Sequence, residues 1–442
     1  MRTLLAAAAA ALVLAAPADA GVTTIASAGP GPSRYDKVTV TKIGPASAKT
    51  VLLLMPGFQG GAGDFTLIGR DIVKRVGGVQ VWALDRRSQA LEDTSRFRDA
   101  LAGRITARQA YDYYAGWIAD PSIQPHFQPI AGRALPYARD WGLTTTLNDV
   151  HRVVQKARAA GRRVILGGHS LGASLTAAYA SWDFAGRPGY KDLDGLVLID
   201  GGLLGSFSTP TLAATKKAYA DLQKSDPFID LLGLGLPWAA GVLSETAAIA
   251  GVREPTASSL LQASPLVPAQ FKGPQPTTNR GAFGYAFDAT TSPEELALIQ
   301  MRMGTLGPDG NWRDGEVTPV ARGEALFAQE PANAAEWYFP KRLTLDVDAA
   351  NALTRNAQTR LLGLRPWHRA GVDVPLYAMQ TSLTKGRVLR GARRFIAASR
   401  IPRGRSVLVD ASPTQSHLDP LAAAPERNRF LATVVPFLKR LR

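Results

Sequence analysis

The chain has 442 residues, of which 46% are hydrophobic and 20% are charged. This composition supports a buried core and excludes a disordered or fibrous protein. The sequence contains no cysteine, so disulfides, thiol catalysis and cysteine-ligated zinc are excluded as well.

The net charge of +15 raises the question of an anionic partner. However, the arginines are spread along the chain in short clusters such as Arg86-Arg87, and no nucleic-acid-binding module accompanies them. We therefore predict a solvated, arginine-rich surface, no nucleic-acid partner and at most a loose attraction to anionic surfaces. The oligomeric state is left open.

The first twenty residues have the pattern of an export signal. Arg2 precedes an apolar run at residues 4–16, and Ala18-Asp19-Ala20 is a small-x-small cleavage site. The run is far shorter than the roughly 20 residues that span a bilayer. We predict cleavage near Ala20 and a secreted, periplasmic or cell-envelope protein that begins near Gly21.

Short apolar runs along the chain predict the strands of one sheet. Most are continuous rather than alternating, and helical stretches such as residues 147–159 separate most of them. Continuous apolar strands that alternate with helices indicate a mainly parallel α/β sheet covered by helices on both faces. The predicted strands are residues 37–43, 50–55, 79–84, 163–166, 196–199, 376–379 and 406–409.

The alternation stops after Asp200, and the next convincing strand begins only at Leu376. This interval is too long for a loop. It reads as mostly helical, at residues 228–252, 293–303 and 346–362, so we predict a large helical cap inserted after the strand that ends at Asp200. A smaller insertion at residues 104–141, which carries Tyr111, Tyr113, Tyr114 and Trp117, is a candidate addition to that cap. The expected divisions are a signal at 1–20, a core at 21–204, the cap or lid at 205–365 and the rest of the core at 366–442.

A candidate nucleophile lies in Gly168-His169-Ser170-Leu171-Gly172, where a predicted strand runs into G-x-S-x-G and then into a helix. This context is that of a nucleophile elbow. A serine hydroxyl attacks only when a base takes its proton, so it must be presented on a tight turn. The glycines two before and two after Ser170 leave room for that turn. Although 42 glycines make a chance match conceivable, the strand before and the helix after the motif favour the catalytic interpretation.

Acyl transfer also needs backbone N–H donors for the negative charge on the substrate oxygen, worth about 3 kcal/mol each. Leu171, directly after the serine, is one candidate donor for this oxyanion hole. The glycine-rich stretch at residues 56–63 should supply the other, with Phe58 the first choice and Gln59 the second. The alternative for this stretch is a plain flexible turn.

The chain has five histidines: His126, His151, His169, His368 and His417. In sheets with this elbow the base follows the nucleophile in the chain, and only His417 lies just past the last predicted strand. We expect His169 to pack beside the elbow, where it and Gln59 are candidate substrate contacts. The earlier histidines show no metal-ligand spacing, so no metal and no other cofactor is expected.

The carboxylate that should orient His417 is less obvious. The usual position, after the next-to-last strand at residues 380–385, has no acid, and none occurs between Val374 and Leu408. Asp200 is the first choice because it ends a strand at the carboxyl edge of the sheet. Asp410 is the second choice, whereas Asp419-Pro420 has the pattern of a helix start.

These motifs resemble the α/β-hydrolase superfamily, in particular its secreted, capped esterase-like and lipase-like members. The resemblance covers residues 35–204 and 366–440 and rests on the serine motif, the turn at residues 55–61 and Ser416-His417-Leu418-Asp419-Pro420. The missing acid after the next-to-last strand departs from the commonest pattern.

The resemblance implies a serine hydrolase. We expect it to cleave a carboxylic ester, small or lipid-like and with an apolar group, through an acyl-serine intermediate at Ser170. Amide or peptide cleavage would use the same machinery. A non-catalytic protein that binds hydrophobic ligands is the alternative from another class, motivated by the missing acid.

Overall fold

The structure is a computed structural model that describes residues 20–207, 209–274, 276–329 and 332–441. The predicted export signal therefore lies outside the described residues, apart from Ala20. Within the described ranges, none of the helices combines the length and the apolar character needed to cross a bilayer.

One central sheet organises the molecule, with the strand order β1-β2-β4-β3-β5-β8-β11-β12. Strand β2 pairs antiparallel with β1 and β4, and every pairing from β4 to β12 is parallel. The strands are β1 (Ala20–Ala26), β2 (Lys37–Ile43), β3 (Thr50–Met55), β4 (Val79–Asp85), β5 (Arg163–His169), β8 (Gly195–Ile199), β11 (Leu376–Gln380) and β12 (Ser406–Asp410). All seven predicted strands are present, and the mainly parallel α/β class is confirmed.

Strand β1 is the one strand of this sheet that the sequence analysis did not predict. It begins at the predicted cleavage site, and its residues are mostly small or polar. Its pairing with β2 along all seven positions supplies the backbone partner that an edge strand needs. The small hairpins β6 (Asp183–Phe184) with β7 (Arg187–Pro188) and β9 (Gly304–Leu306) with β10 (Trp312–Asp314) also lacked a sequence signal.

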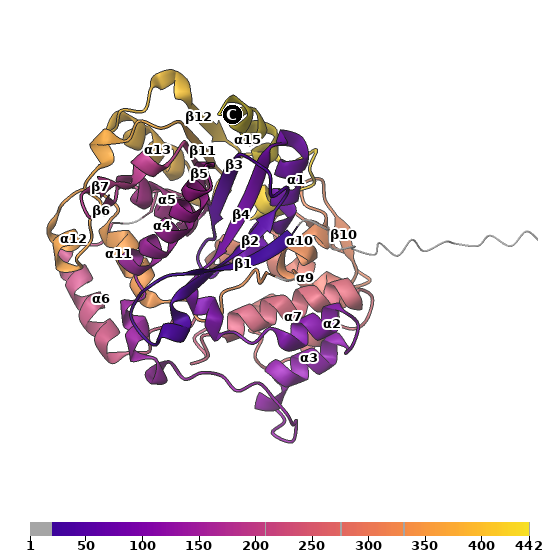
Figure 1. Ribbon diagram of the computed structural model, residues 1–442. Helices are drawn as coiled ribbons and strands as arrows, with labels where there is room; N and C mark the ends of the chain where they lie inside the picture. The colour runs from indigo at the N-terminus through magenta and orange to yellow at the C-terminus, as the bar shows by residue number, and fades with distance from the viewer. Residues whose placement is uncertain (1–19, 208, 275, 330–331, 442) are drawn as a thin grey trace, which may run out of the picture.

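The sheet buries both of its faces, as continuous apolar strands require. Val51 and Leu53 of β3 belong to one core cluster, and Leu52 and Leu54 belong to another, because successive side chains point to opposite faces. One cluster is shared with α4 (Leu143–Ala159), α5 (Leu171–Ser181), α11 (Lys341–Ala349) and α13 (Arg387–Ala397). The other is shared with α1 (Thr66–Val76), α9 (Asn279–Phe287), α10 (Val320–Phe327), α14 (Asp419–Ala422) and α15 (Arg429–Arg440). Figure 1 shows these two sets on opposite sides of the sheet.

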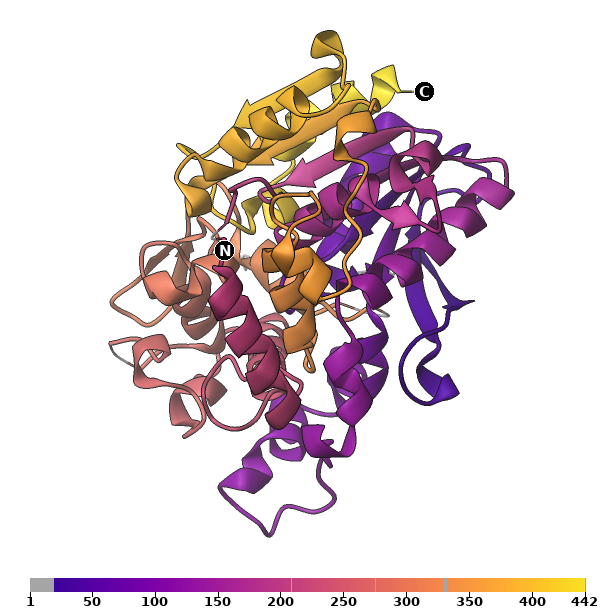
Figure 2. The same cartoon turned by 90° about the vertical axis from the view of Figure 1, so that its left-hand side faces the viewer.

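The chain leaves the sheet after β8 and returns at β11, as predicted, but the intervening elements differ from the expected helices. The intervening helices are α6 (Leu212–Lys224), α7 (Ala239–Arg253), α8 (Leu260–Ala263), α9, α10, α11 and α12 (Ala357–Leu361). In Figures 1 and 2, α6 and α7 lie below the strands together with α2 (Ser95–Leu101) and α3 (Ala107–Tyr114).

Three of the predicted helical stretches are therefore wrong in part. Residues 228–238 form no helix, because Gly233, Gly235 and Pro237 interrupt this apolar run. Residues 294–299 form only a kinked 3-10 helix. Residues 346–362 are divided between α11 and α12, with Leu353 between them at a φ of 49°. Apolar content predicted burial in these segments but not their backbone conformation.

The smaller insertion packs on the larger one. Tyr111 and Tyr114 of α3 share a buried cluster with Trp238, Val242 and Trp337 of the larger insertion. The Tyr111 hydroxyl donates to Ser264 Oγ over 2.7 Å. The aromatic residues noted in the sequence therefore join the two insertions into one body.

Candidate active site

Ser170 lies on a tight turn between β5 and α5. Its φ of 55° and ψ of −119° place a non-glycine residue in a strained region of backbone space, and its N–H donates to the Ile199 carbonyl over 2.8 Å. A Cβ on Gly168 would lie 2.3 Å from the Gly172 carbonyl carbon, and one on Gly172 would lie 2.0 Å from the Met55 carbonyl oxygen. The backbone therefore approaches both Gly168 and Gly172 too closely to leave room for a side chain, as the sequence predicts.

A buried carboxylate–histidine pair lies at the same edge of the sheet. His417 Nδ1 and Asp200 Oδ2 are 2.5 Å apart, and these side chains are 1% and 0% exposed. Ser170 directly follows His169, whose ring centroid lies 4.3 Å from that of His417. Three distant segments therefore bring Ser170, His417 and Asp200 together.

Thr381 completes the surroundings of Asp200, and sequence reasoning missed it. Its N–H donates to Asp200 Oδ1 over 2.7 Å, and its hydroxyl donates to Oδ2. Burial by itself would raise the pKa of Asp200, but the hydrogen bond and charge of His417 and the two bonds from Thr381 hold this pKa below its ordinary value. The stretch that lacks the expected acid therefore supplies donors to an acid from the neighbouring strand. Pairing of Met379 with Ile199 is the register that brings them together.

The other two carboxylates near His417 in sequence have different partners. Asp410 is exposed and accepts hydrogen bonds from the N–H of Ser412 over 3.0 Å and its hydroxyl over 2.6 Å. Asp419 begins α14, as predicted, and it also accepts from the N–H groups of Ser416 and Arg302 over 2.6 and 3.0 Å. Asp419 thus ties the loop that carries His417 to the larger insertion, a role that its local sequence did not indicate.

His169 packs beside the elbow, as expected. It is 2% exposed, and its Nε2 lies 2.9 Å from the carbonyl oxygen of His417. Burial and the nearby His417 lower the pKa of His169 to about 3, so the imidazole is neutral. Because a carbonyl can only accept, Nε2 carries the proton, and His169 holds the backbone of the His417 loop against the end of β5.

The predicted oxyanion loop is anchored by Arg86. This guanidinium donates to the carbonyl oxygens of Pro56, Gly57 and Gly60 over 3.0, 2.7 and 2.9 Å, and to Glu336 Oε2 over 2.7 Å. Arg86 and Glu336 are both buried. The prediction of a solvated arginine surface is therefore wrong at Arg86, and it is wrong at Arg87, which pairs with buried Asp149.

This anchoring satisfies the carbonyl oxygens of Pro56, Gly57 and Gly60 and leaves N–H groups of the loop available. Gln59 has a φ of 51°, and its carbonyl oxygen accepts from the Glu336 N–H over 2.8 Å. Among the residues that the structure describes, no hydrogen-bond acceptor pairs with the backbone N–H of Phe58, Gln59 or Leu171. A Cβ on Gly57 would lie 3.1 Å from Ser170 Cβ, so the loop lies directly against the serine.

The remaining histidines have structural partners. His151 Nδ1 lies 2.8 Å from the Tyr179 hydroxyl, His368 Nε2 lies 2.7 Å from Asp183 Oδ1, and His126 stacks on Trp117. In the described parts of the chain, no group of three or more potential ligand side chains is placed to hold a metal ion.

Comparison with solved structures identifies the architecture. A candidate lipase from Sulfolobus solfataricus superposes with a TM-score of 0.52 at 14% identity, covering 95% of this chain and 94% of that one. This is the α/β-hydrolase fold. Epoxide hydrolase A from Mycobacterium thermoresistibile matches at 14% identity with a TM-score of 0.44, covering 95% and 98% of the two chains. The monoacylglycerol lipase of Paleococcus ferrophilus matches at 11% identity with a TM-score of 0.41, covering 96% and 100%. No protein-family model and no curated protein sequence matches the chain.

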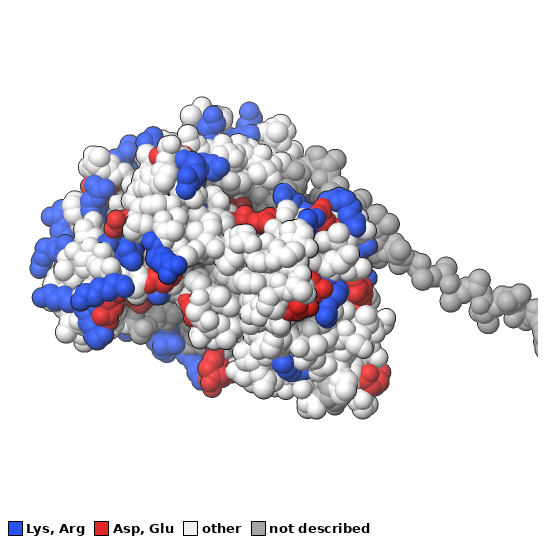
Figure 3. Space-filling model, turned by 90° about the horizontal axis from the view of Figure 1, so that it is seen from below, with Lys and Arg blue, Asp and Glu red and all other residues white. Residues whose placement is uncertain are grey.

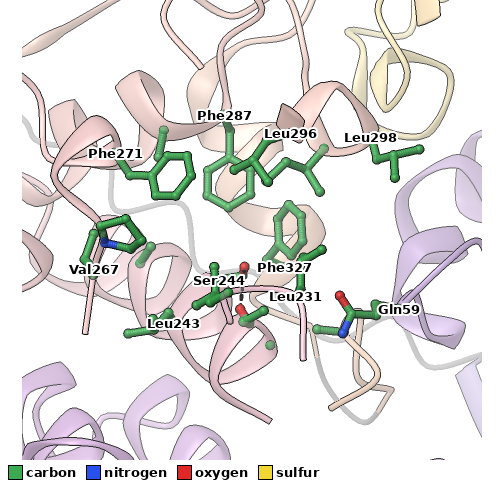
Figure 4. A pocket seen from close by; sticks show the side chains of 18 of the residues that line it. Gln59, Leu231, Leu243, Ser244, Val267, Phe271, Phe287, Leu296, Leu298 and Phe327 are labelled. Carbon is green, nitrogen blue, oxygen red and sulfur yellow. Dashed lines mark hydrogen bonds between the residues drawn. The ribbon is translucent and has the colours of Figure 1, made fainter. Parts of the chain in front are cut away.

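Next to the site, the α/β-hydrolase fold of this chain contains an apolar cavity of about 140 Å³. Figure 4 shows its side chains pointing toward one another from two sides, with Gln59 at one end. Among its polar residues, Ser244 is satisfied by the Ala240 carbonyl oxygen of its own helix. The lining residues are Phe58, Gln59, Leu231, Leu232, Ala240, Gly241, Leu243, Ser244, Ala247, Leu261, Val267, Pro268, Phe271, Ala286, Phe287, Glu295, Leu296, Leu298, Ile299, Phe327 and Ala335.

The cavity adjoins both loops of the site. Phe58 and Gln59 line it from the oxyanion loop. On another side, Ile299 lines it, and the carbonyl oxygen of the next residue, Gln300, accepts from the Leu418 N–H over 3.1 Å. Leu418 directly follows His417. The cavity therefore lies between the loop that carries Phe58 and Gln59 and the segment that is hydrogen-bonded to the His417 loop.

A second, polar cavity of about 130 Å³ lies behind the oxyanion loop and is lined by Asp85, Glu92 and Glu245, among others. Asp85 Oδ1 accepts from the Ala62 N–H over 2.7 Å. Burial raises the pKa of Asp85 to about 7 and raises that of Glu92 well above its ordinary value. Asp85 and Glu92 therefore line the same cavity, and burial makes the ionisation of both carboxyl groups unfavourable.

The raised pKa of Asp85 predicts that the unfolding free energy falls as the pH rises. A folded-state pKa above the unfolded value means that the folded protein binds more protons, so the contribution of Asp85 is complete below pH 4 and lost through pH 7. Between pH 5 and 8 we expect wild type to lose about 3 kcal/mol more unfolding free energy than Asp85→Asn. Urea denaturation of both proteins at the two pH values measures this difference. Equal losses would show that Asp85 titrates normally.

Proposed function

We propose that the protein is a serine hydrolase that cleaves carboxylic esters through an acyl intermediate on Ser170. The observation that carries this proposal is the buried hydrogen bond between Asp200 and His417 next to the strained turn of Ser170. A carboxylate at Nδ1 keeps the imidazole in the tautomer whose Nε2 can accept a proton, and it stabilises the imidazolium that forms.

In the proposed reaction, Ser170 Oγ attacks the ester carbonyl carbon while His417 Nε2 accepts the hydroxyl proton. The N–H groups of Leu171 and of Phe58, or of Gln59 as the second choice, stabilise the oxyanion. The bond to the alcohol then breaks, and His417 returns the proton to the leaving oxygen. A water molecule then gives a proton to His417 Nε2 while its oxygen attacks the acyl carbon. The bond from this carbon to Ser170 Oγ breaks, His417 returns the proton to Oγ, and the acid leaves.

The apolar cavity supports a substrate with an apolar group, small or lipid-like. Binding in a mostly apolar pocket removes hydrocarbon from water, and the cavity adjoins Phe58 of the proposed oxyanion loop. We further propose that residues 205–365 act as a cap, because they supply most of the cavity lining and so shield the reaction from bulk water.

Two alternatives to ester cleavage arise from the sequence: amide or peptide cleavage, and a non-catalytic binding protein. Amide or peptide cleavage uses the same residues, and a substrate panel separates it from ester cleavage. The hypothesis of a non-catalytic binding protein arose from the missing acid after β11. The contact of Asp200 with His417 removes that motive, so we do not pursue it as a proposed function.

A fluorophosphonate probe tests the proposal directly. We expect one covalent adduct per chain, located on Ser170 by peptide mass spectrometry, because only an activated serine hydroxyl attacks the phosphorus atom at neutral pH. Turnover of p-nitrophenyl esters should cease in proportion to labelling.

The matched control is Ser174→Ala, which removes a neighbouring buried hydroxyl that donates to the Gly202 carbonyl oxygen. It should still label, whereas Ser170→Ala should not. Folded wild-type protein that forms no adduct, or that forms one at another serine, would contradict the proposal.

We also propose export, because residues 1–20 have the pattern of a signal and β1 begins where cleavage is expected. Cleavage after Ala20 leaves residues 21–26 free to pair with β2. Mass spectrometry of the protein from its native host should find an N-terminus near Gly21 outside the cytoplasm.

A further inference from the structure

A short apolar loop at residues 231–236, which we call the leucine loop, lies at the rim of the apolar cavity. Its sequence is Leu-Leu-Gly-Leu-Gly-Leu, and none of its four leucines is buried. Leu231 and Leu234 are 40% and 41% exposed. Isolated exposed leucines are ordinary, but several together in one loop next to a cavity are not.

The conformation of the loop keeps these leucines on the surface. Gly233 and Gly235 have φ values of 69° and 73°, and a Cβ on either would meet no atom within 4 Å. The glycines therefore serve the backbone turn rather than close packing. The Gly235 N–H donates to Asp230 Oδ2 over 2.5 Å, which closes the loop on itself. Leu234 projects at the turn and does not line the cavity.

The loop is continuous with the site. Leu231 and Leu232 line the cavity together with Phe58 and Gln59. Just before the loop, the Ile229 N–H donates to the Phe339 carbonyl oxygen over 2.9 Å, and the Phe339 ring centroid lies 4.7 Å from that of Phe58. An apolar path thus leads from the oxyanion loop to exposed leucines.

Cations border the other side of the loop. A hollow of about 490 Å³ is lined by Leu236 of the loop together with Arg133, Arg139, Lys224 and one acid, Asp226. Arg133 and Lys224 are both exposed and line this hollow. On the lower face of the molecule, where the insertions lie, Figure 3 shows mostly uncharged surface interrupted by a few acidic and basic side chains, with Lys and Arg most numerous along one side.

We propose that the leucine loop docks the protein on lipid surfaces that contain anionic lipids. Leu231 and Leu234 insert among the acyl chains, while Arg133 and Lys224 face the anionic headgroups. A substrate ester would then pass from the lipid into the cavity without crossing water. The docking step does not require Ser170 to be a nucleophile, so it can fail or succeed independently of the proposed function.

Vesicle cosedimentation tests this proposal with the Ser170→Ala protein, in which the vesicle lipids cannot be consumed by an acyl-serine route. We expect stronger binding to vesicles of phosphatidylcholine with 30% phosphatidylglycerol than to phosphatidylcholine alone, because each Lys or Arg at the surface is attracted to the anionic headgroups. Adding Leu234→Asp should lower the partition coefficient for the anionic vesicles by about tenfold or more, because it replaces an inserting leucine by a charge that the headgroups repel.

The matched control is Leu361→Asp in α12, a leucine that is 38% exposed and lies outside the loop. It should leave vesicle binding unchanged, and circular dichroism should be the same for all variants. Equal binding of the Leu234→Asp and parent proteins, or equal losses from both Asp variants, would overturn the proposal. So would a parent protein that ignores vesicles but forms a dimer that Leu234→Asp dissociates in sedimentation velocity, since the loop would then bind a second copy.

Discussion

Replacing Asp200 by Asn is expected to lower kcat for ester hydrolysis by about 10⁴-fold with the fold intact. Asp200 Oδ2 accepts from His417 Nδ1 over 2.5 Å in a fully buried setting. An Asn side chain whose Oδ1 keeps the bond from the Thr381 N–H places its NH₂ where Oδ2 was, so it presents an amide N–H to the imidazole. His417 would then be held in the tautomer that cannot accept the serine proton. Steady-state kinetics on a soluble p-nitrophenyl ester measure the loss.

The matched control is Asp410→Asn, which alters the exposed carboxylate that hydrogen-bonds Ser412. We expect this variant to keep wild-type kcat, because Asp410 is not a partner of His417. Should Asp410→Asn prove inactive while Asp200→Asn retains turnover, the assignment of the acid would be reversed. Unfolding curves of both variants separate a catalytic loss from a loss of structure.

Arg86→Met is expected to cost about 3 to 5 kcal/mol of unfolding free energy, because it leaves Glu336 buried without its cation. It also removes the donors to the carbonyl oxygens of Pro56, Gly57 and Gly60. In the folded fraction we expect kcat to fall about a hundredfold, the order of magnitude for losing one oxyanion donor. Urea denaturation and active-site titration measure the two effects separately.

The double variant Arg86→Met/Glu336→Met distinguishes stability from positioning. Removing both charges should recover part of the unfolding free energy, but not kcat, since the three carbonyl oxygens still lack their donor. Arg104→Met, which breaks a pair with Asp99 in which the arginine is 62% exposed, should cost less than about 1 kcal/mol. If kcat recovers with stability in the double variant, Arg86 has no positioning role.

The strands were predictable because burial on both faces leaves a local mark. Residues 50–55 form a short apolar run between polar and glycine-rich neighbours, and β3 spans these same residues. The insertions were less predictable. The apolar run at residues 228–252 indicated burial correctly for α7, but glycine and proline at positions 233–237 turn its first half into the leucine loop.

The candidate site likewise contains residues that the sequence predicted and residues that it did not. The sequence motif predicted the turn at Ser170, and the position of His417 after the last strand predicted that it would return to the same sheet edge. Thr381 and Arg86 carried no local signal. Thr381 bonds Asp200, 181 positions away, and Arg86 bonds both Glu336, 250 positions away, and the carbonyl oxygens of Pro56, Gly57 and Gly60. Neither periodicity nor turn chemistry encodes such contacts.

The amino-acid sequence by itself determined the parallel sheet, the strained serine turn and the end of the sheet where His417 lies. These follow from interactions between near neighbours: apolar runs form buried strands, and glycines permit the turn. The tertiary structure alone placed Asp200 rather than Asp410 against His417, buried Arg86 under the loop predicted to form the oxyanion hole and shaped the cavity between Phe58 and the leucine loop. Each of these depends on which distant segments pack together, and that is decided by the burial of the whole chain.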